Sequence, residues 1–299
     1  MTQERQNGFE ERYFYASDGL RLHARDYGYG NPLAKHALPV VCLAGLSRNS
    51  RDFHRLALYL SSAKTPRRVL ALDYRGRGRS DYDRDWRNYD VKIELGDVLQ
   101  VLTVAGVEEA IFVGTSREGI ITMALSAARP ALIRGAVLND IGPAIEGKGL
   151  VRIRGYVGKL PAPANEREAI DILKNLMNVQ FTALSEDAWR AYARATWKED
   201  GGRLVLDYDP ALMRTLEGPD LEAPIPPLWG LFEGLKRVPV LTLRGANSDL
   251  LSAETVEAMK NVHPHLEAVT VPNQGHAPLL QDREIIRQIR RFVGRVENG

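Results

Sequence analysis

Ser116 lies in a segment whose pattern suits a catalytic serine. The apolar run 111–113 leads through Gly114 to Ser116, and a second apolar segment begins at Ile120. This pattern predicts a strand, a sharp turn and a helix. In such a turn, called a nucleophile elbow, strained backbone projects the serine hydroxyl from the sheet, and the N–H of the next residue, here Arg117, can face a developing oxyanion. We therefore expect Ser116 to be a nucleophile.

A serine hydroxyl needs a base, and His276 is the residue best placed to supply one. The base must take the hydroxyl proton, and a carboxylate must hold its tautomer and stabilise its charge. His276 and Asp249 each lie in a loop directly after a predicted strand. Asp140, which ends an earlier predicted strand, is the alternative acid. Because strand ends of α/β sheets gather ligands at one edge, we expect Ser116, His276 and Asp249 to meet there.

Glu118 is the unusual residue of this elbow. The common spelling is G-x-S-x-G, and here the second glycine comes one place late, at Gly119. A glutamate in the first turn of a helix complements the helix dipole. A carboxylate within ~4 Å of the oxyanion would instead cost roughly 4 kcal/mol and slow the reaction about a thousandfold. Glu118 could also serve as an extra acid or base, and the sequence leaves these alternatives open.

The elements expected to position these residues alternate between strands and helices. Alternating β and α segments with buried-type strands predict a mostly parallel sheet with helices on both faces. The first two strands form an antiparallel hairpin, because the turn signal Ser17-Asp18-Gly19 joins them. The predicted strands are 10–16, 20–27, 39–43, 69–72, 111–113, 135–140, 238–243 and 266–271. The predicted helices outside residues 142–236 are 51–62, 90–105, 252–262 and 282–296, besides the one that follows the elbow.

The alternation stops in residues 142–236, which predict an inserted helical cap. Helical patterns at 166–178 and 185–198 are separated by proline-rich joints. The expected domains are therefore a first core part at 1–141, the cap at 142–236 and a second core part at 237–299.

Two groups of residues are expected to be structural. The arginines of 75–87 alternate with aspartates, which favours a solvated salt-bridge network over an anion site. The aromatic residues of the cap have helical spacing, which is more often typical of a core than of a pocket. Trp229 is the one that we expect to face the site, as a substrate-pocket residue.

The amino-acid composition limits the classes of binding partner that we expect. Forty Lys plus Arg against thirty-eight Asp plus Glu give a formal charge of +2, which offers no electrostatic case for nucleic acid. No apolar run approaches the ~20 residues that span a bilayer, and the polar N-terminus lacks a signal region. We expect a cytoplasmic protein with a small-molecule substrate, no membrane partner, and Cys42 as a buried thiol. No cluster has metal-ligand spacing and no dinucleotide fingerprint occurs, so no cofactor or metal is expected. The oligomeric state is left open.

Three motifs together resemble the α/β-hydrolase fold superfamily. They are the elbow, the D-x-R-G-x-G-x-S loop at 73–80 and the histidine turn Gly-His-Ala-Pro at 275–278. The chain order Ser116, Asp249, His276 is also the order of this family. The resemblance covers nearly the whole chain and implies an eight-stranded sheet with helices on both faces. It is weakest in the cap, which in this family sets specificity.

The resemblance also implies an oxyanion hole. The loop after the third strand matches the oxyanion loop of the family in position, so the Leu46 N–H would pair with the Arg117 N–H. The frequent His-Gly of that loop reads Ala44-Gly45 here. Because a backbone N–H carries the role, the missing histidine matters little to the chemistry.

The function expected from this resemblance is that of an esterase- or lactonase-like serine hydrolase. It would cleave a small, fairly hydrophobic carboxylic ester or lactone through an acyl-enzyme. Carbon–carbon bond hydrolysis, acyl transfer and perhydrolysis use the same triad and remain alternatives. Another alternative is a catalytically weak ligand-binding homologue, whose elbow has lost activity because Glu118 replaces the usual glycine.

Overall fold

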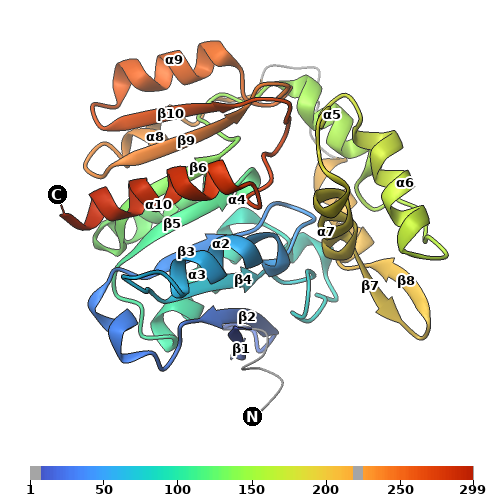
Figure 1. The fold of residues 1–299 in the computed structure, drawn as a ribbon, viewed down its shortest axis with the longest axis horizontal. Coiled ribbons are helices and arrows are strands. Elements are labelled where there is room, and N and C mark those ends of the chain that lie inside the picture. Colours follow the sequence, from blue (N-terminus) through green and yellow to red (C-terminus); the bar gives the residue numbers. More distant parts are fainter. Residues whose placement is uncertain (1–7, 218–224, 299) are drawn as a thin grey trace.

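The computed structural model describes residues 8–217 and 225–298, and its centre is an eight-stranded sheet in the order β1-β2-β4-β3-β5-β6-β9-β10 (Figure 1). β2 pairs antiparallel with β1 and with β4, and every other neighbouring pair is parallel. The predicted mostly parallel eight-stranded sheet is therefore confirmed. The strands are β1 (Phe9–Tyr15), β2 (Arg21–Tyr27), β3 (Val40–Leu43), β4 (Val69–Asp73), β5 (Ala110–Thr115), β6 (Ile133–Asn139), β9 (Val240–Gly245) and β10 (Leu266–Val271).

Helices cover both faces of this sheet, and successive side chains of each strand point to opposite faces. In β3, Val41 and Leu43 join the apolar core on one face, whereas Val40 and Cys42 join the core on the other. Cys42 is a buried free thiol, as predicted. The first face is covered by α3 (Val91–Val104), α4 (Arg117–Ala128), α8 (Trp229–Glu233) and α9 (Ala253–Val262), and the second by α2 (His54–Ser61) and α10 (Arg283–Asn298).

Most of the segment between β6 and β9 gathers at one end of the sheet (Figure 1). The expected helices at 166–178 and 185–198 are present as α6 and α7. Their first turns are capped by the side chains of Asn165 and Ser185. The elements of this segment besides α8 are α5 (Gly147–Tyr156), α6 (Glu166–Met177), α7 (Glu186–Thr196), β7 (Trp197–Asp200) and β8 (Arg203–Leu206).

Several elements of this segment are not predicted from the sequence, among them α5 and the β7–β8 hairpin. α5 contains Gly147, Gly149 and Gly155, which weaken a helical pattern. The β7–β8 hairpin turns at Gly201 and Gly202, whose φ values of 55° and 76° lie in the left-handed region. α7 therefore ends at Thr196, two residues before the predicted end.

Short 3₁₀ helices complete the described structure. Among residues 8–217 and 225–298, no helix combines the length and the apolar character needed to cross a bilayer. The 3₁₀ helices are η1 (Pro32–His36), η2 (Ser50–Phe53), η3 (Trp86–Asn88), η4 (Pro130–Leu132) and η5 (Pro210–Leu216).

Candidate active site

Ser116 occupies a strained turn between β5 and α4. Its φ of 57° and ψ of −129° lie outside the regions that side-chain-bearing residues ordinarily adopt, as in a nucleophile elbow. Close packing requires glycine on both sides of this turn. A Cβ on Gly114 would lie 2.5 Å from Thr122 Oγ1, and a Cβ on Gly119 would overlap Cγ2 of Ile141. The backbone of α4 therefore packs most closely against Ile141 at position 119, and position 118 can carry a side chain.

His276 reaches Ser116 from the loop that follows β10. Its Nε2 atom lies 2.7 Å from Ser116 Oγ, and its Nδ1 atom lies 2.8 Å from Asp140 Oδ2. Since a carboxylate can only accept, Nδ1 carries the proton and Nε2 accepts the hydrogen bond from the serine hydroxyl. The backbone N–H of His276 also donates to Gln180 Oε1 at 2.8 Å. The histidine is thus held at three points.

Asp140, and not Asp249, is the carboxylate that contacts His276, so the expected orienting acid is wrong in the structure. Asp140 is fully buried and has a φ of 55°. The Gly245 N–H donates to its Oδ1 atom at 2.7 Å, and the Ser248 hydroxyl donates to its Oδ2 atom at 2.5 Å. These two hydrogen bonds fix the position of the carboxylate beside the imidazole.

Asp249 instead connects the core to α5. Its carboxylate accepts from Arg152 Nε at 2.6 Å and from Arg152 Nη2 at 2.9 Å. Burial acts to raise the pKa of Asp249, but the hydrogen bonds and charge of Arg152 outweigh it, so that its pKa is below the ordinary value. Asp140 takes the contact with His276 because β6 lies between β5 and β9 in the sheet. Its carboxylate is therefore beside the elbow.

The expected oxyanion donors lie on the two sides of Ser116. Leu46 follows β3, which is the neighbour of β5, with Leu43 paired to Gly114. A Cβ on Gly45 would lie 3.6 Å from Ser116 Cβ, so the loop rests directly on the elbow. Arg117 is the first residue of α4, and the first N–H groups of a helix have no partner within it. The roles of Leu46 and Arg117 stay a prediction.

A cavity of about 80 Å³ opens above the Ser116 hydroxyl. It is small beside the roughly 300–1,000 Å³ of ordinary ligand pockets. Residues of the loop after β3, of α5 to α7 and of the loop that carries His276 meet there. The apolar lining consists of Leu46, Phe53, Ile153, Leu160, Leu173, Met177, Ala277, Pro278, Leu279 and Leu280.

Arg48 supplies a cation to this otherwise mostly apolar lining. Asp52 accepts from its Nε and Nη2 atoms at 2.8 and 2.6 Å, and Thr196 Oγ1 accepts from Nη1 at 2.7 Å. The guanidinium lies 4.4 Å from the centre of the Tyr192 ring. Since a guanidinium has five N–H groups, two remain after these bonds to the described residues. Nothing in the sequence pattern singled out Arg48, although it lies only two residues beyond Leu46.

Comparison with known proteins shows the family to which this chain belongs. A family model described as the alpha/beta hydrolase family matches residues 40–288. The chain belongs to this family. It is 34% identical over 269 residues to a 3-hydroxybutyrate-oligomer hydrolase of Cupriavidus necator, covering 87% of this chain and 89% of that protein. It is 27% identical to a 2-(acetamidomethylene)succinate hydrolase of Mesorhizobium japonicum, covering 86% and 85% of the two chains. An α/β-hydrolase crystal structure from Novosphingobium aromaticivorans superposes with a TM-score of 0.88 at 40% identity, covering 96% and 99%.

Glu118 does not face the cavity of this α/β-hydrolase. Its carboxyl group is fully buried, and Oε1 accepts from Arg117 Nη1 at 3.1 Å. Oε2 has no hydrogen-bond partner among the described residues. Burial raises the pKa of Glu118 to about 7, even though the charges of Arg117 and Arg77 act to lower it. Glu118 is therefore buried beside Arg117 and is not among the residues that line the cavity.

Trp229 does not line the cavity, so its expected role as a pocket residue is wrong. Its ring packs against Phe232, with ring centroids 6.0 Å apart. α8 packs on α4 and thus on one face of the sheet. The aromatic side chains of residues 142–236 that do line the cavity are those of Tyr156, Tyr192 and Tyr208. Within the described ranges, no group of three or more His, Cys, Asp or Glu side chains could hold a metal ion.

Proposed function

We propose that this α/β-hydrolase cleaves a small, fairly hydrophobic carboxylic ester or lactone through an acyl-enzyme. The observation that carries the proposal is the continuous relay from Ser116 Oγ to His276 Nε2 at 2.7 Å and from His276 Nδ1 to Asp140 at 2.8 Å. Its nucleophile lies on a strained elbow that opens into a cavity. A relay of this kind converts an ordinary hydroxyl into a nucleophile at neutral pH.

In the first step, Ser116 Oγ attacks the carbonyl carbon while His276 Nε2 takes its proton. Asp140 stabilises the imidazolium that forms. The N–H groups of Leu46 and Arg117 bind the oxyanion of the tetrahedral intermediate. His276 then returns the proton to the leaving alkoxide, which leaves as the alcohol, and the acyl group remains on Ser116. A water molecule, deprotonated by His276, releases the acid by the same steps.

The lining of the cavity supports a substrate with a second oxygen function. Aliphatic side chains suit a short alkyl chain, whereas Arg48 offers N–H donors and the rings of Tyr156 and Tyr192 carry hydroxyls in the same lining. The relative from Cupriavidus necator is named for oligomers of 3-hydroxybutyrate. We therefore infer that short oligoesters of hydroxy acids are the substrate class to test first, with residues 142–236 acting as the cap that encloses them.

The test is a covalent trap combined with burst kinetics. A fluorophosphonate should label Ser116, and 4-nitrophenyl butyrate should release one equivalent of nitrophenol per active site before steady turnover. Both signals should be lost in Ser116→Ala. Ser126→Ala is a matched control, because Ser126 lies on the same helix α4 and its hydroxyl donates to the Met123 carbonyl at 2.6 Å. Labelling that persists in Ser116→Ala would overturn the proposed nucleophile, and a parent protein with neither signal would favour the ligand-binding alternative.

A further inference from the structure

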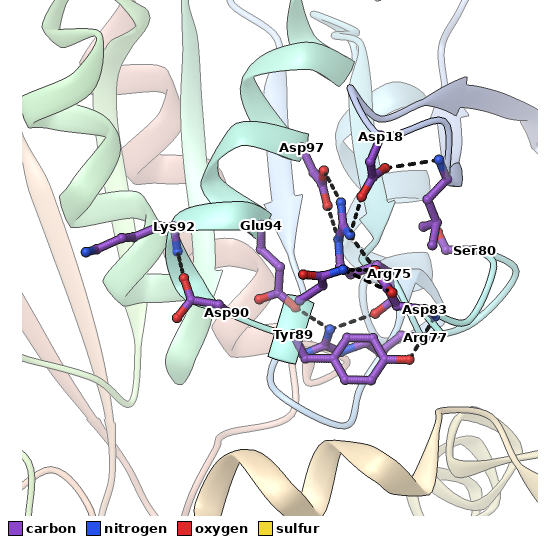
Figure 2. A network of polar contacts seen from close by, with 12 residues as sticks. Asp18, Arg75, Arg77, Ser80, Asp83, Tyr89, Asp90, Lys92, Glu94 and Asp97 are labelled. Carbon is purple, nitrogen blue, oxygen red and sulfur yellow. Dashed lines mark hydrogen bonds and ion pairs between the residues drawn. The ribbon is translucent and has the colours of Figure 1, made fainter. Parts of the chain in front are cut away.

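Two arginines of the loop after β4 are buried, contrary to the solvated network expected for residues 75–87. Arg75 is 1% exposed and Arg77 is fully buried. Each binds a carboxylate from α3, Asp97 and Glu94 respectively (Figure 2). A buried guanidinium is tolerated only when it is paired and hydrogen-bonded. The two pairs differ in what else they contact.

Arg77 contacts the backbone of the oxyanion loop. Its Nε atom donates to the Leu46 carbonyl at 2.8 Å. Its Nη1 atom donates to the Arg75 carbonyl at 2.7 Å and to Glu94 Oε1. Leu46, whose N–H is one expected oxyanion donor, is therefore held through its carbonyl by the buried side chain of Arg77.

Glu94 extends this contact to the elbow. Its second oxygen, Oε2, accepts from Nη1 of Arg117, the residue directly after the nucleophile. Arg117 Nη2 also donates to the Tyr89 carbonyl at 3.0 Å. One fully buried carboxylate thus bridges the two residues that flank the oxyanion site, Arg117 directly and Leu46 through Arg77.

We propose that Arg77 and Glu94 are positioning residues that set the separation of the two oxyanion donors, Leu46 N–H and Arg117 N–H. This inference rests on the proposed function, because it assigns a role within the same reaction. An oxyanion hole is effective only when its donors already point to where the charge develops, so a support that fixes both donors acts on the transition state. Neither side chain lines the cavity, and neither would contact the substrate.

Glu118 has a place in this network. Its Oε1 atom accepts from Arg117 Nη1 at 3.1 Å, the same Nη1 atom that donates to Glu94. Two arginines, Arg77 and Arg117, and two glutamates, Glu94 and Glu118, therefore form one cluster next to the turn. The residue that breaks the usual elbow spelling is therefore a buried hydrogen-bond partner of Arg117, and burial raises its pKa to about 7.

The discriminating variant is Glu94→Gln, with Asp97→Asn as its matched control. Both acids lie on α3, three residues apart, and each is buried against one arginine of the same loop. Asp97 accepts from Arg75 Nε and Nη2, both at 2.7 Å, and Arg75 also contacts Asp18 and Asp83. None of these contacts involves Leu46 or Arg117. Both variants should lower the melting temperature, but only Glu94→Gln should alter catalysis.

The expected kinetic result is weaker binding of the transition state with little change in substrate binding. For 4-nitrophenyl butyrate, Glu94→Gln should lower kcat about 10- to 100-fold, less than or similar to the loss of an oxyanion donor itself, and should leave KM within about threefold. It should weaken inhibition by an alkyl trifluoromethyl ketone by the same factor, because that adduct carries an oxyanion. Asp97→Asn should keep kcat and the inhibition by the ketone within about twofold of the parent values.

The inference is overturned if Asp97→Asn lowers kcat as much as Glu94→Gln, or if folded Glu94→Gln retains its kcat. Should Glu94→Gln not fold, Arg77→Lys replaces it. Lysine keeps the charge but cannot place donors on the Leu46 carbonyl and Glu94 in the same planar geometry. Arg77→Lys with unchanged kcat and unchanged ketone inhibition would equally refute the inference. A parent protein that is inactive on esters and unlabelled by fluorophosphonate would count against the proposed function instead.

Discussion

Asp140→Asn is expected to remove most of the activity, whereas Asp249→Asn should not. The Asp140 carboxylate lies 2.8 Å from His276 Nδ1 and is fully buried. With charge centres ~4 Å apart and an effective dielectric near 20, its attraction for the imidazolium is roughly 4 kcal/mol. Losing it corresponds to about a thousandfold in rate, and an asparagine that favours the wrong histidine tautomer adds to the loss, as in other serine triads where the total is ~10⁴.

Asp249→Asn removes only a partly exposed ion pair with Arg152, whose two side chains are 23% and 22% exposed. Such a pair contributes ~0–1 kcal/mol to stability, and kcat/KM should stay within about threefold. The assay is kcat/KM for 4-nitrophenyl butyrate at pH 8, with circular dichroism to show that both variants are folded. Equal losses in the two variants, or a folded Asp140→Asn with parental activity, would refute the assignment of the orienting acid.

Three further changes have distinct signatures. Because burial raises the pKa of Glu118 to about 7, the folded state keeps a proton that the unfolded state releases near 4.5, so stability should fall as the pH rises through this interval. In urea unfolding measured at several pH values, the free energy of unfolding should fall less with pH for Glu118→Gln than for the parent protein. The same pH dependence in both proteins would contradict this. Arg48→Met should lower kcat/KM for a 3-hydroxybutyrate dimer ester about tenfold relative to kcat/KM for an alkyl ester, because roughly one hydrogen bond to the substrate is lost. An unchanged ratio of the two kcat/KM values would exclude Arg48 from substrate recognition. Gly119→Ala should destabilise the protein by about 1–3 kcal/mol in thermal unfolding, since its Cβ overlaps Cγ2 of Ile141. The same change should cost less in an Ile141→Ala background, which lacks that methyl group, and an equal cost in both backgrounds would contradict the clash.

The contact between Ser116 and His276 was predictable because the local sequence around each residue indicates its position at a strand end. Ser116 follows an apolar strand and precedes an apolar helix, and His276 lies in a turn directly after the last strand. Small residues at positions 114 and 119 signal the tight packing of the elbow. These signals involve residues close in sequence, so they survive in the sequence pattern.

The acid could not be chosen in the same way. Asp140 and Asp249 both follow strands and both precede His276, so chain order fits either. The decision depends on β6 lying between β5 and β9, and on Arg152 of α5 binding Asp249. The pocket residues were missed for a similar reason, because Tyr156 and Trp229 look alike as cap aromatics until α5 and α8 take their different places.

The sequence by itself determined the order of strands and helices, the mostly parallel sheet and the strained turn at Ser116, because hydrophobic periodicity and turn residues act over a few residues. Only the tertiary structure decided that Asp140 meets His276 and that Glu118 is buried outside the cavity. It also decided that Arg77 and Glu94 are buried behind Leu46 and Arg117. Those outcomes depend on which distant segments pack together, and burial there converts charges expected at the surface into a paired network under the elbow.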